Sequence, residues 1–163
     1  MDNQDEFKGL GGWLILVGIG IVIRPILLLA TTVPLYLQVF TDGIWEAITR
    51  EGSEAYNPLL SSLLIGEIIY NIVFFSLSLY LIYLFFAKHY FFPRFYIAIV
   101  VVSLIIIPLD AWLVSLALPN QPMFDSETIT EFAQTLISGL IWVPYMLFSK
   151  RVKAIFVAKK PIK

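Results

Sequence analysis

Three ionisable side chains interrupt long apolar stretches of this sequence, where charged residues are rare. Arg24, Glu67 and Asp110 each lie well inside a separate stretch. A charge at the centre of a bilayer costs at least ~2.5–3.5 kcal/mol, so we expect Arg24 to reach toward Glu67, Asp110 or both. Asn71 follows Glu67 by about one helical turn and shares its face. These residues predict an intramembrane polar network of Arg24, Glu67, Asn71 and Asp110.

Such a network admits three interpretations. A dry network, in which every polar group is satisfied, would set the register and orientation of the helices. A hydrated network would serve as a proton or ion site, because two carboxylates facing one guanidinium leave one carboxylate to carry a proton. Binding of a substrate or a lipid is the third interpretation. Whether the space around Arg24, Glu67 and Asp110 is dry or wet separates the first two.

The rest of the sequence carries no catalytic or metal-binding pattern. Cysteine is absent, which excludes disulfides, thiolate nucleophiles and cysteine metal sites. The single histidine, His89, lies between Lys88 and Tyr90 in a short polar segment, where an interfacial role is expected. No serine-hydrolase, zinc-protease or phosphate-loop motif is present. We expect no enzyme activity, no cofactor and no metal. A lipid-directed enzyme with Glu67 or Asp110 as general base is the weakest alternative.

The elements that position these residues are four apolar stretches. Hydrophobic residues make up 59% of the 163 residues and charged residues 14%, against roughly 45–50% and about 25% in soluble domains. The stretches cover about 11–40, 58–87, 95–118 and 129–148, and each reaches the ~20 residues that cross a bilayer as a helix. The sequence therefore predicts an all-α integral membrane protein. Residues 1–163 form a single domain, a four-transmembrane-helix bundle with a basic tail at 149–163.

The charges between the stretches predict the orientation of the bundle. Four spans place both termini and the 88–94 link on one side, and the two longer loops on the other. The loop side has Arg50 as its single basic residue, whereas the terminus side has nine: Lys8, Lys88, Arg94, Lys150, Arg151, Lys153, Lys159, Lys160 and Lys163. Because basic residues are retained inside, we expect cytoplasmic termini. The same basic side is expected to meet anionic lipid headgroups.

Two short motifs flank the apolar stretches. Residues 9–14 read Gly-Leu-Gly-Gly-Trp-Leu, and residues 149–156 read Ser-Lys-Arg-Val-Lys-Ala-Ile-Phe, preceded by Tyr145. The chain thereby resembles a bacterial inner-membrane family, the domain of unknown function 2569 family. That family opens with Gly-Gly-Trp-Leu and closes with Ser-x-Arg-Val-x-x-Thr-Phe, so Ile155 replaces its threonine. The resemblance implies a small four-span protein of the cytoplasmic membrane and carries no established activity.

The two motifs are expected to meet on one cytoplasmic surface. Arginine and lysine at the end of the last span could bind phosphate headgroups, cap the last carbonyls or contact the glycine turn. The alternative is plain stabilisation of the helix ends. The candidate lipid or partner surface comprises Gly11, Gly12, Trp13, Ser149, Arg151 and Lys153.

These features favour a non-enzymatic accessory or assembly protein. It would act through lateral contacts or through its basic cytoplasmic face. The expected partners are anionic lipids, another membrane protein or a second copy of the chain, and no nucleic acid. The alternative function is a small proton-linked transporter or channel-like protein that uses Arg24, Glu67 and Asp110.

Overall fold

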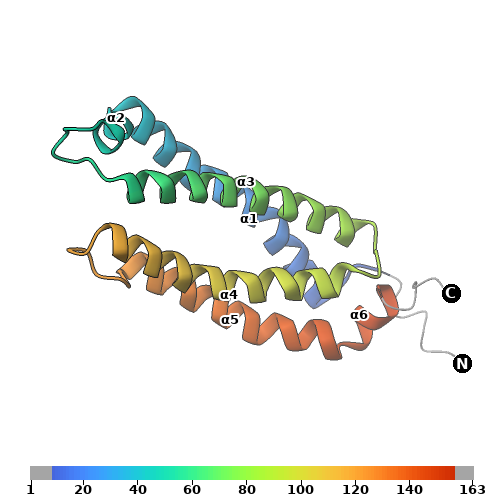
Figure 1. Cartoon of the computed structure of the whole chain (residues 1–163). Helices are drawn as coiled ribbons and strands as arrows, with labels where there is room; N and C mark the ends of the chain where they lie inside the picture. The colour runs from blue at the N-terminus through green and yellow to red at the C-terminus, as the bar shows by residue number, and fades with distance from the viewer. Residues whose placement is uncertain (1–8, 157–163) are drawn as a thin grey trace, which may run out of the picture.

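The computed structural model describes residues 9–156, and this part of the chain is entirely helical apart from its turns and loops. Four long helices lie side by side and run alternately in opposite directions, with two short helices at the ends (Figure 1). The all-α prediction is confirmed. The helices are α1 (Trp13–Thr41), α2 (Ile44–Thr49), α3 (Pro58–Phe86), α4 (Phe92–Ala117), α5 (Ser126–Phe148) and α6 (Lys150–Ile155).

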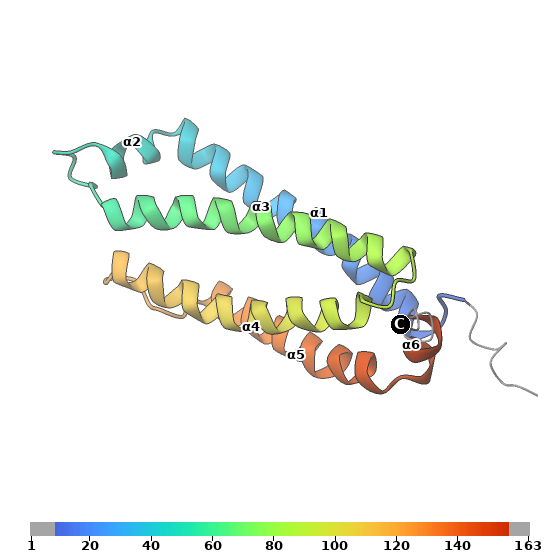
Figure 2. The same ribbon diagram turned by 45° about the vertical axis from the view of Figure 1, so that its right-hand side comes forward.

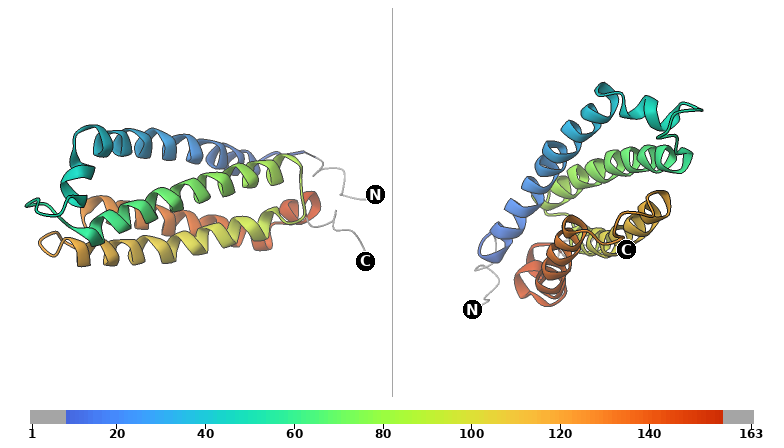
Figure 3. Two further views of the ribbon diagram at one scale, coloured as in Figure 1. Left: turned by 45° about the horizontal axis from the view of Figure 1, so that its top comes forward. Right: turned by 90° about the vertical axis from the view of Figure 1, so that its left-hand side faces the viewer.

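The long helices are arranged as two pairs. α1 packs on α3 and α4 packs on α5, while α3 and α4 join the pairs. The start of α1, the α3–α4 turn and α6 lie at one end of the bundle, which we call the terminus end (Figure 2). From there α1 leans away from α5 as it runs toward α2, so the bundle is wider at its opposite, loop end (Figure 3).

The hydrophobic core is concentrated at the terminus end. Leu14, Leu84 and Phe92 are almost fully buried there, together with Val152 and Phe156 from the α6 region. In contrast, most large apolar side chains on the outside of the long helices are exposed on the isolated chain. Such a surface is unfavourable in water and is typical of helices that face lipid.

Side chains define several helix boundaries. Asn57 caps α3, since its Oδ1 accepts a hydrogen bond from the Leu60 N–H at 3.0 Å, while its Nδ2 donates to the Ala117 carbonyl at 2.8 Å. Asp125 caps α5 by accepting from the Thr128 N–H at 2.7 Å. The Asn57 contact also ties the start of α3 to the end of α4.

Three helices, α1, α3 and α4, are long and apolar enough to cross a membrane. α5 has 23 residues, a length of about 35 Å at 1.5 Å per residue, but its first half carries Glu131 and Gln134. The described part of the chain is thus an all-helical protein with three candidate membrane spans. The predicted tail from residue 149 is described as far as residue 156, and Lys8, Lys159, Lys160 and Lys163 lie outside the described residues.

Candidate functional site

The predicted polar residues of α3 lie on its face toward α1. Glu67 and Asn71 are half-buried, and the Asn71 side-chain amide donates a hydrogen bond to the Tyr36 hydroxyl of α1 at 2.6 Å. A hydrogen bond between two helices at membrane depth satisfies both groups without water. Asn71 therefore links α3 to α1 in the loop-side half of the bundle.

Acidic residues from three helices gather in that same half. Glu67 of α3 interacts electrostatically with Asp110 of α4, and Asp110 in turn interacts with Glu131 of α5. Across residues 9–156, however, no three acidic or histidine side chains are close enough together to hold a metal ion. The cluster is an acidic region between helices rather than a coordination site.

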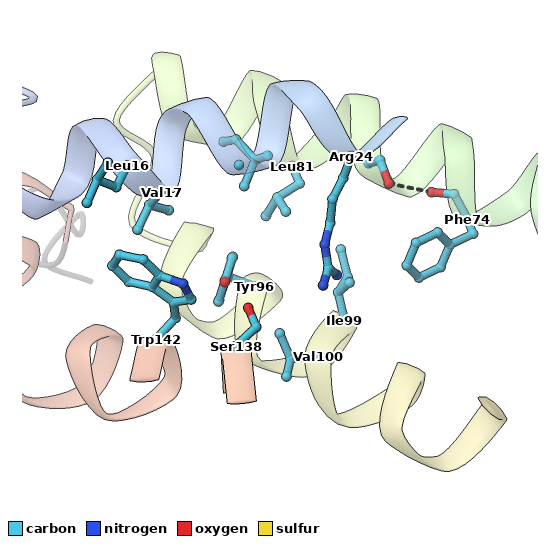
Figure 4. Close-up of a pocket in the computed structure, with 13 residues that line it drawn as sticks. Leu16, Val17, Arg24, Phe74, Leu81, Tyr96, Ile99, Val100, Ser138 and Trp142 are labelled. Carbon is cyan, nitrogen blue, oxygen red and sulfur yellow. Dashed lines mark hydrogen bonds between the residues drawn. The ribbon is translucent and has the colours of Figure 1, made fainter. Parts of the chain in front are cut away.

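Arg24 lies apart from Glu67 and Asp110, although it acts electrostatically on Glu131. It makes neither a hydrogen bond nor an ion pair among the described residues, and its guanidinium points toward α4 beside Ile99 (Figure 4). The same level of α3 is occupied by Phe74, seven residues beyond Glu67 and thus about 10 Å farther along the helix. The structure brings Glu67, Asn71 and Asp110 into one region and leaves Arg24 in another.

Arg24 lines a cavity of about 80 Å³ where the four long helices meet. The cavity walls are mostly apolar, with polar groups from all four helices (Figure 4). The Tyr96 side chain is 9% exposed, and the Ser78 hydroxyl donates to the Phe74 carbonyl at 2.8 Å. The lining includes Leu16, Gly20 and Arg24 of α1, Ser78 of α3, Tyr96 of α4, and Ser138 and Trp142 of α5.

The head and tail motifs meet at the terminus end. A Cβ built on Gly11 would lie 2.8 Å from the Arg151 Nη1, and one on Gly12 would lie 3.0 Å from it. Gly12 also has a φ of 62°, which side chains other than hydrogen rarely tolerate. The two glycines therefore let the Arg151 guanidinium lie directly against the backbone that leads into α1.

The remaining candidate surface residues divide into two groups. Ser149 caps α6, because its Oγ accepts from the Val152 N–H at 3.4 Å, and the buried ring of Phe156 stacks on Phe92 at 4.7 Å. In contrast, Trp13 is 62% exposed, and Lys153 is also exposed. Of the six candidate surface residues, Gly11, Gly12, Ser149 and Arg151 join α6 to the start of α1, whereas Trp13 and Lys153 are exposed.

Sequence reasoning missed several participants. Tyr36 reads as one more aromatic residue of an apolar stretch, and its bond to Asn71 depends on how α1 packs on α3. Glu131 lies at the outer end of the fourth apolar stretch, yet α5 begins already at Ser126, and Glu131 interacts electrostatically with Asp110. Tyr96 reads as an interfacial anchor near a span end. A signal for it was its spacing of seven from Ser103, on the same face as Asp110.

Comparison with known proteins confirms the family that the chain resembles. No curated protein and no solved structure matches the chain. The sequence profile of one family, described as "Protein of unknown function (DUF2569)", matches residues 7–157. This range contains both motifs and all four long helices, so the chain belongs to the DUF2569 family.

Proposed function

We propose that the chain is a four-span protein of the bacterial cytoplasmic membrane, with both termini in the cytoplasm and α5 as the fourth span. The antiparallel packing of α5 on α4 supports this proposal, because α5 runs beside a candidate span along its length. Its length of about 35 Å is sufficient for the hydrocarbon core. The terminus end also carries Arg94, Lys150 and Lys153, whereas Arg50 lies at the loop end.

Within that membrane, the protein acts as a non-enzymatic accessory protein that binds anionic lipid headgroups at its terminus end. The observation that carries this proposal is the position of α6. Burial of Val152, Ile155 and Phe156 holds α6 across the end of the bundle, while Lys150 and Lys153 stay exposed. Cations held at the depth of the headgroups attract anionic lipids. Lateral contacts with a membrane protein or with a second copy would use the apolar outer faces.

The experiment compares two substitutions that each remove one positive charge. Lys153→Gln acts at the terminus end, and Arg50→Gln is the matched control at the loop end. The proteins are placed in nanodiscs that contain phosphatidylglycerol and phosphatidylcholine, and the bound anionic lipid is counted by native mass spectrometry. At about 1 kcal/mol per basic residue, Lys153→Gln should lower the preference for phosphatidylglycerol about fivefold. An equal effect of Arg50→Gln, or no effect of either substitution, would contradict the proposal.

The acidic cluster favours a second candidate function, a small proton-linked transporter or channel-like protein. Glu67 and Asp110 are half-buried carboxylates of adjacent helices that interact electrostatically. Such acidic groups within spans often belong to proton pathways. Vesicles with a trapped pH-sensitive dye should then show proton movement that Glu67→Gln and Asp110→Asn abolish and Glu127→Gln preserves. Movement equal to that of protein-free vesicles would rule this function out.

A further inference from the structure

The cavity that Arg24 lines has no role in the functions proposed above. Arginine stays protonated at all accessible pH values, and a charge at membrane depth is costly unless an opposite charge accompanies it. Glu131 is an acidic group that interacts electrostatically with Arg24, but the two form no ion pair among the described residues. The Arg24 guanidinium therefore keeps its hydrogen-bond donors directed into the cavity (Figure 4).

The polar groups around Arg24 favour an oxyacid anion. Guanidinium presents paired N–H donors that match the two oxygens of a carboxylate or phosphate. The hydroxyls of Tyr96 and Ser138, which are hydrogen-bonded to each other, line the same space. A volume of about 80 Å³ is sufficient for one such head group. The remaining walls, such as Leu16, Ile99 and Val100, are apolar.

The terminus end of the bundle is closed to a ligand from water. Leu14, Phe92, Val152 and Phe156 are each 0% exposed, so the core and α6 seal the end of the bundle next to the cavity. An anion without an apolar tail has no path along the bundle axis from that side.

The cavity is accessible instead from the side, between α1 and α5. These two helices share few contacts, and α1 leans away from α5 beyond the pair formed by Trp13 and Trp142, whose rings are 6.0 Å apart. Leu16, which lines the cavity, is 52% exposed. A Cβ on Gly20 would meet nothing within 4 Å. In a membrane, this lateral opening faces lipid chains rather than water.

From these observations we infer that the Arg24 cavity binds the anionic head of a single-chain lipid, a carboxylate or a phosphate, whose tail lies between α1 and α5. Arg24 is the counter-ion, and the hydrogen-bonded pair of Tyr96 and Ser138 supplies one further O–H donor to the head group. Arg24 and Leu16 are exposed on the isolated chain, so the site opens sideways between the helices. It is separate from the headgroup contacts of Lys150 and Lys153, because it lies beyond the sealed terminus end. Lys153→Gln should leave it unchanged.

The test measures binding of defined probes to the full chain in phosphatidylcholine nanodiscs. The probes are oleate labelled with ¹³C at its carboxyl carbon, oleoyl lysophosphatidate, methyl oleate, acetate and inorganic phosphate. We expect saturable binding of one or both acidic oleoyl lipids. Tighter binding of oleate would indicate a site for a carboxylate head, and tighter binding of oleoyl lysophosphatidate would indicate a site for a phosphate head. Competition by methyl oleate equal to that of oleate, or equally tight binding of acetate or inorganic phosphate, would overturn the inference.

Four variants locate the binding. Arg24→Gln should weaken it about tenfold or more, and Arg24→Lys should retain part of it. Gly20→Leu should block it by filling the open space, whereas Gly66→Leu on α3, which also meets nothing within 4 Å, should not. Gly20→Leu keeps Arg24, so it tests the site even if Arg24→Gln does not fold. Binding that is unaffected by Gly20→Leu, or equally weakened by Gly66→Leu, would contradict the proposed location.

Discussion

At the scale of single residues, the contact between Arg151 and the glycine pair joins the two ends of the chain. Arginine is a planar donor that can lie flat on backbone when no Cβ intervenes. Gly11 and Gly12 provide that surface, and Ser149 sets the start of the turn that carries Arg151. The motifs therefore form one structural unit at the terminus end.

Replacing Gly12 by alanine tests this unit. A side chain there meets both a φ of 62° and the Arg151 Nη1 at 3.0 Å. Because a residue other than glycine in such a region costs about 1–3 kcal/mol, Gly12→Ala should lower the free energy of unfolding by that amount. The change in the free energy of unfolding is measured by unfolding both proteins in detergent while the loss of helical circular dichroism is monitored.

The control for this prediction is Gly20→Ala. Gly20 lies inside α1 with open space at its Cβ position, so alanine should be neutral or stabilise the helix by up to about 1 kcal/mol. Equal stability of Gly12→Ala and the original chain would show that the glycine conformation is not required.

A second prediction at this scale concerns Phe156. This side chain is 0% exposed, and its ring lies 4.7 Å from that of Phe92. Truncating a buried phenylalanine costs about 3–5 kcal/mol, so Phe156→Ala should strongly destabilise the terminus end. Phe148→Ala is the matched control, since Phe148 is 74% exposed. The same measurement gives the free energy of unfolding of both variants, and an equal decrease in the two would disprove the sealing role of Phe156.

At the scale of elements, α5 depends on the cap that precedes it. The Asp125 carboxylate accepts a hydrogen bond from the Thr128 N–H at 2.7 Å, at the positive end of the helix dipole. This hydrogen bond holds the pKa of the Asp125 carboxyl below its usual value. A lowered pKa in the folded protein means that the ionised carboxylate stabilises the fold.

The pH dependence follows from that sign. The stabilisation from Asp125 should be fully present above its ordinary pKa of about 3.9 and fade as the pH falls through the lower pKa of the folded state. The thermal midpoint, measured from pH 7 down to pH 3, reports this loss. Asp125→Asn keeps an oxygen that accepts the bond, so it should retain the cap at pH 7 and remove this contribution to the pH dependence. An unchanged acid profile in Asp125→Asn would contradict the prediction.

At the scale of the whole molecule, α5 decides between three spans and four. If α5 crosses the membrane, the α4–α5 loop and α6 lie on opposite sides. The chain has no cysteine, so single cysteines can be labelled without background. Gln121 in the loop and Lys153 in α6 are both exposed positions for such labels.

We expect a membrane-impermeant maleimide to label Gln121→Cys in intact cells and Lys153→Cys only after permeabilisation. The basic residues at the terminus end set this orientation, because they resist export across the membrane. The original chain, which lacks cysteine, is the control for unspecific labelling. Labelling of both positions in intact cells would show that α5 does not cross.

Much of the fold could be predicted from the sequence, because helix length and apolarity are local properties. The predicted stretches at 58–87 and 129–148 correspond closely to α3 and α5. A capping residue acts on the helix that directly follows it, so the sequence offers Asp125 or Ser126 as the cap of this helix, and the structure shows that Asp125 is the cap. The joint position of the head and tail motifs also follows from an even number of antiparallel helices.

The separation of Arg24 from Glu67 and Asp110 was decided by the tertiary structure. Depths counted along the sequence assume parallel, evenly packed helices, which would put Arg24 within reach of Glu67 and Asp110. The real bundle is packed tightly at one end only, where Gly18 allows the Phe85 ring to approach α1 and α6 seals the core. That one-sided packing tilts α1 away from α5 (Figure 3). With this tilt, Asn71 lies beside Tyr36 and Arg24 faces a cavity. The sequence could not predict this arrangement, because the angle between two helices depends on contacts between residues far apart in the chain.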